Sequence, residues 1–492
     1  MREVHKQSAP FSVKGHWWLP NSERRVAGEL HYDEESISLS LFSGLTDAIA
    51  DSLFSANPEE TNHAIVYGES QDNVRITVLR LFYTKWTPDI TTLAIRPGTK
   101  VAIRSATLRC GTFIEGAHLQ PDELQFRTCR IEVPNINSWL GVSPFKVDIA
   151  PTLEKISLHY TSPNNETLNL NGQQICVRFI HSVAPPGSPY NLAPTISYLP
   201  QMEIESPKPL PLSQLLDHSH DIVSLLSMVY GGPVASTELL LFQDEDEFEP
   251  LSIFFPRHKV SPKEYTAHDF LIRRKDIDEV LKEVFENWLG ANENLKRARR
   301  MLLSSERRPS SFIELRFLPL VQAAEVLSNE APQTTIVNVD EFREIRNRML
   351  DSVPDDIPPE LTHSIKNSLQ WANGRSLRGK IRSLLSELQD ETCNLFSVDK
   401  ERFIAGVVRT RNYYTHYAAK SREKILNGME LHWAIQKLSL MIRIVLLVRA
   451  GVPETKLQKA IRSNERLAQE RSAWRNATED GTAHSDAESE LE

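Results

Sequence analysis

The sequence predicts an α+β multidomain chain, in which an antiparallel β-rich domain of the sandwich or barrel type precedes an all-α helical domain. Up to about residue 205, apolar and polar residues alternate in short segments, as they do in half-buried strands. From about residue 276, apolar residues recur at helical spacing, and the acidic run 244–247 separates the two patterns. We therefore expect a β-rich domain at residues 1–255, a helical domain at 256–476 and an acidic, disordered tail at 477–492.

The strands follow from the period-two alternation of apolar residues. Residues 36–42 place Ile37, Leu39 and Leu41 on one face, and residues 74–83 repeat this pattern. Turn signals such as Pro97-Gly98 separate further strand-like segments at 101–108, 124–133, 156–160 and 176–182. Many short strands divided by such turns are typical of antiparallel sandwiches and barrels.

The helices follow from apolar residues spaced three and four positions apart. A helix is expected at 212–230, where Gly231-Gly232-Pro233 ends it, and a strand follows at 238–242. Prolines divide the region after residue 276. We expect helices there at 276–290, 292–304, 310–329, 339–351, 358–372, 376–389, 399–421, 428–450 and 453–474.

Composition favours a soluble, cytoplasmic protein. The hydrophobic content of 40% over 492 residues is ordinary for a chain of two or three globular domains. The N-terminus lacks a signal-peptide pattern, and the longest apolar run, near residues 438–448, is shorter than the ~20 residues that span a bilayer. None of the four cysteines lies at CxxC spacing. We therefore expect reduced thiols, no membrane contact, no metal site and no other cofactor.

Charge is distributed unequally along the chain. Residues 1–249 carry 18 Lys and Arg against 30 Asp and Glu, a net charge of −12, whereas residues 250–475 carry 38 against 29, a net charge of +9. A basic domain suits polyanion binding, although an ordinary helical surface explains the same excess. We expect the acidic half to restrain the basic half by docking on it.

The segment 409–417 gathers the side chains that RNA cleavage uses. It contains two arginines, an amide, a histidine and three tyrosines: Arg409, Arg411, Asn412, Tyr413, Tyr414, His416 and Tyr417. Arginine holds phosphate by charge and by paired donors. Histidine moves protons near neutral pH, and tyrosine rings stack on unpaired bases. The combination favours RNA cleavage over other common reactions.

The same segment carries a family resemblance. Arg411, Asn412 and His416 follow the order of an arginine, a polar residue and, after a short spacer, a histidine. In this the helical half resembles a HEPN domain (higher eukaryotes and prokaryotes nucleotide-binding) of the ApeA-like group, through residues 312–318, 376–381 and 403–417. Residues 15–20 and 26–33 resemble the ApeA N-terminal domain, so the resemblance covers most of the chain.

The resemblance implies an anti-phage defence protein. Such HEPN proteins act as metal-independent endoribonucleases, commonly as dimers, and halt the infected cell by abortive infection. The N-terminal domain is then a sensing or regulatory module that answers an unidentified phage-derived trigger. The substrate is RNA, and a structured RNA with an exposed loop, such as a tRNA, would suit the chemistry.

Each residue of the motif has an expected role. His416 serves as general acid or base, Arg411 stabilises the phosphorane, and Asn412 orients either group. Arg409 is an auxiliary phosphate ligand. Tyr413 and Tyr417 are expected to contact the substrate, with stacking most favoured for Tyr417.

Helical geometry leaves one question open. Positions five apart on a straight helix lie ~140° apart, so Arg411 and His416 do not share a face, whereas Arg409, Asn412 and His416 do. The helix is irregular, or the long arginine reaches around it, or Arg411 meets His416 of a second chain across a two-fold axis. We favour the third explanation, a homodimer with a composite active site.

Structural interpretations compete with these roles. A lone histidine on a helix is usually a hydrogen-bonded structural residue, and tyrosines at such positions are more often core or interface residues. The alternative function is a non-catalytic HEPN module that binds nucleotide or mediates assembly in a defence or toxin–antitoxin system. Non-enzymatic HEPN domains tend to lack the arginine, polar residue and histidine that this chain retains.

Overall fold

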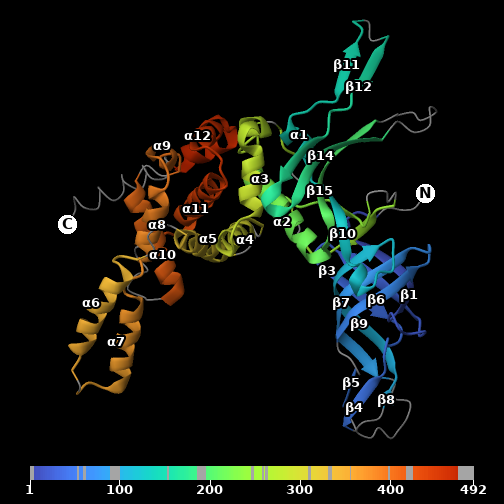
Figure 1. The fold of residues 1–492 in the computed structure, drawn as a ribbon, viewed down its shortest axis with the longest axis horizontal. Coiled ribbons are helices and arrows are strands. Elements are labelled where there is room, and N and C mark those ends of the chain that lie inside the picture. The colour runs from blue at the N-terminus through green and yellow to red at the C-terminus, as the bar shows by residue number, and fades with distance from the viewer. Residues whose placement is uncertain are drawn as a thin grey trace. The chain divides into compact units, whose positions relative to one another are not determined.

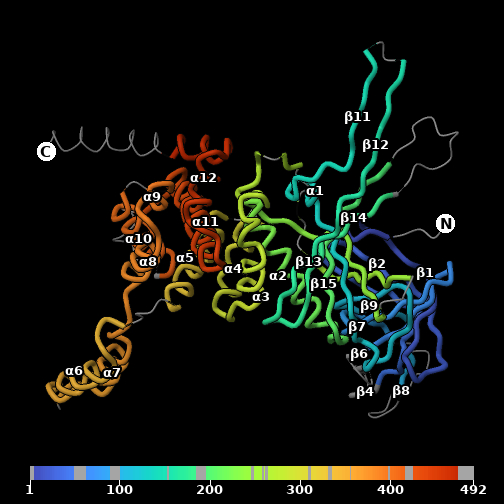
Figure 2. The backbone as a smooth tube through the Cα atoms, turned by 45° about the horizontal axis from the view of Figure 1, so that its top comes forward, coloured from blue at the N-terminus to red at the C-terminus, as the bar shows by residue number. Residues whose placement is uncertain are grey.

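The chain, seen here as a computed structural model, divides into a β-rich unit and a helical unit (Figures 1 and 2). The β-rich unit comprises Met1–Leu226 and Val234–Tyr265, and the helical unit comprises Ser227–Pro233 and Thr266–Glu492. The predicted order of fold classes is thereby confirmed. The residues that the structure describes are 5–52, 55–58, 62–88, 100–151, 154–184, 196–244, 249–257, 260, 264–266, 268–307, 312–330, 335–354, 356–396, 399–416 and 425–474.

Six antiparallel strands form a closed barrel in the β-rich unit. They are β1 (Phe11–Trp18), β2 (Val26–Asp33), β3 (Ser36–Leu41), β6 (Asn62–Ser70), β7 (Arg75–Pro88) and β9 (Ile103–Glu115). Their order is β9-β3-β2-β1-β6-β7, and β7 pairs again with β9, which closes the ring. Closure leaves these strands without exposed edges, which is how barrels avoid edge-to-edge association.

The same sheet continues beyond β9 as an open extension. Its strands, in spatial order, are β17 (Leu251–Phe254), β16 (Glu238–Phe242), β10 (Gln125–Glu132), β15 (Ser197–Pro211), β14 (Ile175–Ala184) and β13 (Glu166–Leu170). Two small sheets accompany it, β11 (Phe145–Ile149) with β12 (Ile156–Tyr160), and β5 (Ser55–Pro58) with β4 (Ala48–Ser52) and β8 (Lys100–Val101). The remaining elements are the helices α1 (Ile136–Leu140) and α2 (Leu212–Tyr230) and the 3₁₀ turns η1 (Pro121–Glu123) and η2 (Asn171–Gln173).

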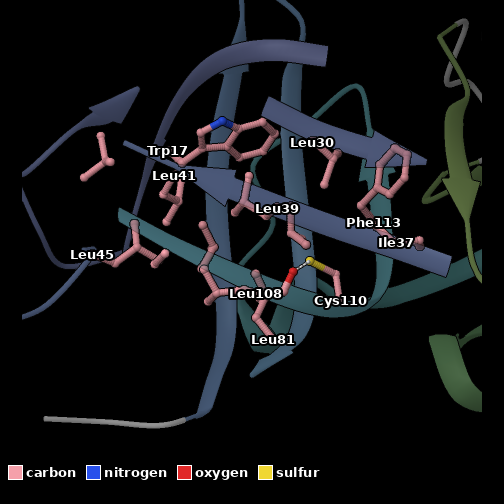
Figure 3. Packing of buried hydrophobic residues seen from close by; sticks show 14 of the residues in the cluster. Trp17, Leu30, Ile37, Leu39, Leu41, Leu45, Leu81, Leu108, Cys110 and Phe113 are labelled. Atoms are coloured by element: carbon pink, nitrogen blue, oxygen red, sulfur yellow. Dashed lines mark hydrogen bonds between the residues drawn. The ribbon is translucent and has the colours of Figure 1, made fainter. Parts of the chain in front are cut away.

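Alternating side chains fill the barrel with an apolar core. The ring of Trp17 lies fully buried inside it, together with Leu30, Leu39 and Leu108 (Figure 3). Gly68 on β6 lies opposite Trp17, where a Cβ atom would overlap the indole ring. Glycine is therefore required there by the close approach of ring and backbone.

The cysteines are structural. All four are free, and Cys110, Cys129 and Cys393 are buried. Burial raises the pKa of the Cys110 thiol to about 12, so it stays protonated and unreactive near neutral pH.

The helical unit packs around one central helix. Its elements are the turns η3 (Arg274–Asp276) and η4 (Asp278–Val280), and the helices α3 (Leu281–Leu289), α4 (Glu293–Arg307), α5 (Ile313–Ser328), α6 (Val339–Asp351), α7 (Pro359–Trp371), α8 (Leu377–Ser386), α9 (Asp390–Cys393), α10 (Lys400–His416), α11 (Gly428–Arg449) and α12 (Glu454–Ser463). Helix α5 contacts α4, α8, α10 and α11. Phe317, Leu320 and Ala324 are fully buried on it, so α5 is the core helix on which the others pack.

Helix α11 is a core helix rather than a membrane span. It is the one described helix long and apolar enough to cross a bilayer, with a mean hydropathy of 1.5. However, 72% of its apolar window is buried within the protein. Arg443 interrupts its apolar surface and pairs with Glu306 of α4.

Two of the predicted helices differ in the structure. The helix expected at 276–290 begins only at Leu281, as α3, because the 3₁₀ turns η3 and η4 precede it. The helix expected at 453–474 is wrong in one respect, because α12 ends at Ser463 and a second helix runs over 465–474. The buried Asn464 between them is extended; its Oδ1 accepts from the Leu467 N–H at 3.0 Å, while its Nδ2 donates to backbone carbonyls of residues 268–270. The helix expected at 399–421 is seen as α10 up to His416, and residues 417–421 lie outside the described residues.

We predict that Gly68→Ala destabilises the β-rich unit by about 1–3 kcal/mol, because the added methyl group overpacks the barrel against Trp17. Urea unfolding followed by tryptophan fluorescence measures the change. Gly172→Ala is the matched control, since no atom lies within 4 Å of a Cβ built there, and its effect should stay within about 0.5 kcal/mol. Equal stability of the two variants would contradict the proposed packing.

Candidate functional site

Helix α10 carries the predicted motif and is anchored at its start by side chains. Asp399 accepts a hydrogen bond from the Arg402 N–H at 2.9 Å, which satisfies one of the free amides of the first turn. Arg382 of α8 donates to both carboxylate oxygens of Glu401, at 2.9 and 2.8 Å. The helix buries Phe403, Ile404 and Val407 and leaves Arg409 and Asn412 exposed. Its direction is thus fixed by an apolar face and an ion pair.

Arg411 lies against α5 within the same chain. Its Nη2 is 3.3 Å from Oε1 of Glu325, and its Nη1 donates to the side-chain oxygen of Asn412 at 3.3 Å. The side chain of Arg411 is 31% exposed and that of Glu325 is 25% exposed, so the pair is half-buried. The structure therefore brings Arg411 and Asn412 together and holds the guanidinium beside a carboxylate.

The other predicted ligands of substrate lie around this pair. Arg409 is exposed, and its Nε donates to the Ala405 carbonyl one turn earlier at 3.2 Å. Tyr413 and Tyr414 are half-buried, with ring centroids 5.5 Å apart at 67°. Tyr414 also meets Phe317 of α5 edge-on at 6.4 Å. These rings stabilise the contact between α10 and α5. The contact supports the interpretation of Tyr414 as a structural residue.

The motif histidine follows five positions later on an unbroken helix. Helix α10 continues from Lys400 to His416, so no irregular turn separates Arg411 from His416. On such a helix the two Cα–Cβ directions differ by ~140°. The side chain of His416 and all of Tyr417 lie outside the described residues.

Leu426, just before α11, packs against the middle of α10. Thr410 is fully buried and its Oγ1 accepts from the Leu426 N–H at 2.9 Å. Leu426 also packs on Gly406, where a Cβ would lie 3.1 Å from its Cδ2 atom. Together these contacts fix the approach to α11 against the middle of α10, and they were not predicted from the sequence.

Cationic side chains lie on the motif helix and on the neighbouring α11. Burial lowers the pKa of Lys437 on α11, and the nearby charge of Arg402 lowers it further. Arg402 and Arg409 are both exposed on α10. A polyanion is attracted to such a surface because its negative charge offsets the repulsion between the cations.

Glu325 is a candidate site residue that the sequence analysis missed. It stands in the run Leu318–Leu327, where it is the one charged residue among mostly apolar neighbours. A carboxylate in an apolar helix face is costly to bury without a partner, so its presence there signals a nearby cation. Which cation it meets depends on the packing of α5 against α10, which periodicity does not reveal.

Comparison with protein families places both halves of the chain. Residues 12–288 match the ApeA N-terminal domain 1, which covers β1 to α3. Residues 318–456 match the Apea-like HEPN domain, which includes Glu325, Arg411, Asn412 and His416. No curated protein and no solved structure matches the chain significantly. The first match alone spans more than half of the chain, and the two follow in the expected order, so the chain belongs to the family of ApeA-like HEPN proteins.

Proposed function

We propose that the chain is an anti-phage endoribonuclease that cleaves RNA without a metal ion and causes abortive infection. The family is one of HEPN-type defence proteins, whose HEPN domains are usually ribonucleases. The observation that carries the proposal is Arg411, half-buried beside Glu325 and bonded to Asn412 on the helix that ends at His416. A guanidinium held at a basic surface suits a phosphate substrate.

The proposed reaction uses the nucleophile that RNA carries. His416 takes the proton of a ribose 2′-OH as the 2′-oxygen bonds to phosphorus, or gives a proton to the leaving 5′-oxygen as the P–O5′ bond breaks. The products are a 2′,3′-cyclic phosphate and a 5′-hydroxyl. Arg411 stabilises the extra negative charge of the phosphorane, and Arg409 binds a neighbouring phosphate. Tyr413 and Tyr417 contact the bases of an unpaired loop, such as that of a tRNA.

Glu325 has the role of a positioning residue in this proposal. A free arginine side chain samples many rotamers, and the 3.3 Å contact with Glu325 restricts them. The carboxylate also lowers the net charge of the site, so it weakens phosphate binding in the ground state. Glu325 instead favours the reaction by orienting Arg411 toward the phosphorane as its negative charge develops.

A homodimer completes the site. Arg411 is directed toward α5, and the helix direction places His416 ~140° away from it. A two-fold axis beside α10 brings the arginine of one chain to the histidine of the other, which gives two composite sites per dimer.

The β-rich unit senses a phage-derived trigger and restrains the nuclease in the cytoplasm of uninfected cells. The net charge of −12 over residues 1–249 supports restraint by docking, because residues 250–475 carry +9.

We predict that His416→Ala lowers RNA cleavage by about 100- to 10,000-fold, because it removes the general acid or base. In cells the variant should lose toxicity and phage protection, and sequencing of RNA ends should show no new 5′-hydroxyl termini. His363→Ala, at an exposed histidine of α7, is the matched control and should behave as wild type. If His416→Ala protects and cleaves as well as wild type, the chain is a non-catalytic assembly or nucleotide-binding module.

We predict that Glu325→Ala lowers kcat about tenfold without raising KM, whereas Glu325→Gln retains more activity because it still accepts a bond from Arg411. Steady-state cleavage of a short RNA measures both constants. Glu314→Ala is the control, because Glu314 lies on the same helix and has no side-chain partner among the described residues. Faster cleavage by Glu325→Ala would show that the carboxylate restrains Arg411 rather than positions it.

We predict that Arg411→Ala and His416→Ala chains are each inactive alone but recover up to about a quarter of wild-type activity when mixed and reassembled. Half of randomly paired dimers join the two variants, and each such dimer has one intact composite site out of two. A dilution series of wild-type protein should show specific activity falling as the dimer dissociates. Activity that stays flat through dissociation, with no complementation, excludes the composite site.

A further inference from the structure

A separate pocket lies in the helical unit, away from the residues of the motif. Its volume is about 230 Å³, and it is lined by α4, α5, α11, the segment 231–233 and the helix over 465–474. Three guanidinium groups line it, from Arg316, Arg443 and Arg466. Nothing in the family match or in the proposed nuclease reaction gives these residues a role.

Two of the three arginines are neutralised by carboxylates of the same pocket. Nη2 of Arg443 lies 2.9 and 2.7 Å from the two oxygens of Glu306, and the Arg443 side chain is only 6% exposed. Arg466 donates to the Gly231 carbonyl at 3.0 Å and lies 3.9 Å from Glu470. These contacts fix the geometry of the pocket wall. They pair Glu306 with Arg443 and Glu470 with Arg466.

The third arginine has no counter-charge. Arg316 is half-buried, its Nε is buried without a hydrogen-bond partner, and its guanidinium makes no hydrogen bond or ion pair with any residue that the structure describes. Burial lowers the pKa of the neighbouring His432, and the charge of Arg316 lowers it further. A half-buried guanidinium without a counter-charge is stabilised when an anion binds beside it.

Size and lining define the class of anion. The buried side chains of Leu440, Leu467 and Trp474 give the pocket apolar wall, while Arg316 and Arg466 present paired donors. A volume of about 230 Å³ lies just below the range of pockets for drug-sized ligands, which excludes an RNA strand. We propose that this pocket binds a small organic phosphate of the size of a sugar phosphate, with its phosphate on Arg316.

The test is calorimetry and thermal unfolding of the full chain with inorganic phosphate, ribose 5-phosphate and AMP. Ribose and adenosine at matched ionic strength are the unphosphorylated controls. We expect one phosphorylated molecule to bind per chain and to raise the unfolding temperature with concentration, and the controls to have no effect. This expectation is independent of the proposed nuclease activity.

Variants separate this pocket from the motif. Arg316→Ala should weaken phosphate binding by about tenfold or more without lowering the unfolding temperature of the free protein, because the side chain has no partner to lose. Arg316→Lys should retain part of the affinity. Arg297→Ala, at an exposed arginine of α4, should bind as wild type. Failure of all three phosphorylated probes to bind, or unchanged binding by Arg316→Ala, overturns the proposal.

Discussion

The burial of α5 is the constraint on which the helical unit depends. Four helices pack on α5, and its fully buried side chains, including Phe317, Leu320 and Ala324, face them on several sides. Burial of each large apolar side chain contributes about 1.5–3 kcal/mol relative to exposure, so this helix supplies a large share of the stabilisation of the unit. It also carries Arg316 and Glu325. The pocket and the motif are therefore both placed by one rigid element.

The Arg411–Glu325 pair contributes little to stability and mainly orients the Arg411 side chain. Half-exposed ion pairs of this length contribute about 0–1 kcal/mol, because both groups remain partly hydrated. A guanidinium that remains partly exposed is still available to a phosphate. The edge-on contact of Tyr414 with Phe317 stabilises the same α10–α5 contact without using charge. Apolar packing thus sets the position of the helix, and the ion pair sets the direction of one side chain.

The sequence predicted what depends on local periodicity and missed what depends on distant contacts. Alternation located β12 and β16 at their observed bounds, and helical spacing located α6. The sequence did not decide between a sandwich and a barrel. The pairing of β7 with β9 closes the barrel, and alternation within single strands does not reveal which strands pair. Helical geometry predicted that Arg411 and His416 do not share a face, but it did not identify the partner of Arg411, because Glu325 lies 86 positions away. The break at Asn464 was missed because its cause is three carbonyls near residue 269.

Helix α5 contains a proline, Pro319, between Arg316 and Glu325. Pro319 has no N–H to donate to the carbonyl of Leu315, and Leu315 is 60% exposed, so water reaches that end of the helix. Helix α5 therefore lacks one backbone hydrogen bond next to the turn that carries Arg316, whereas Glu325 lies in the later turns beyond the proline.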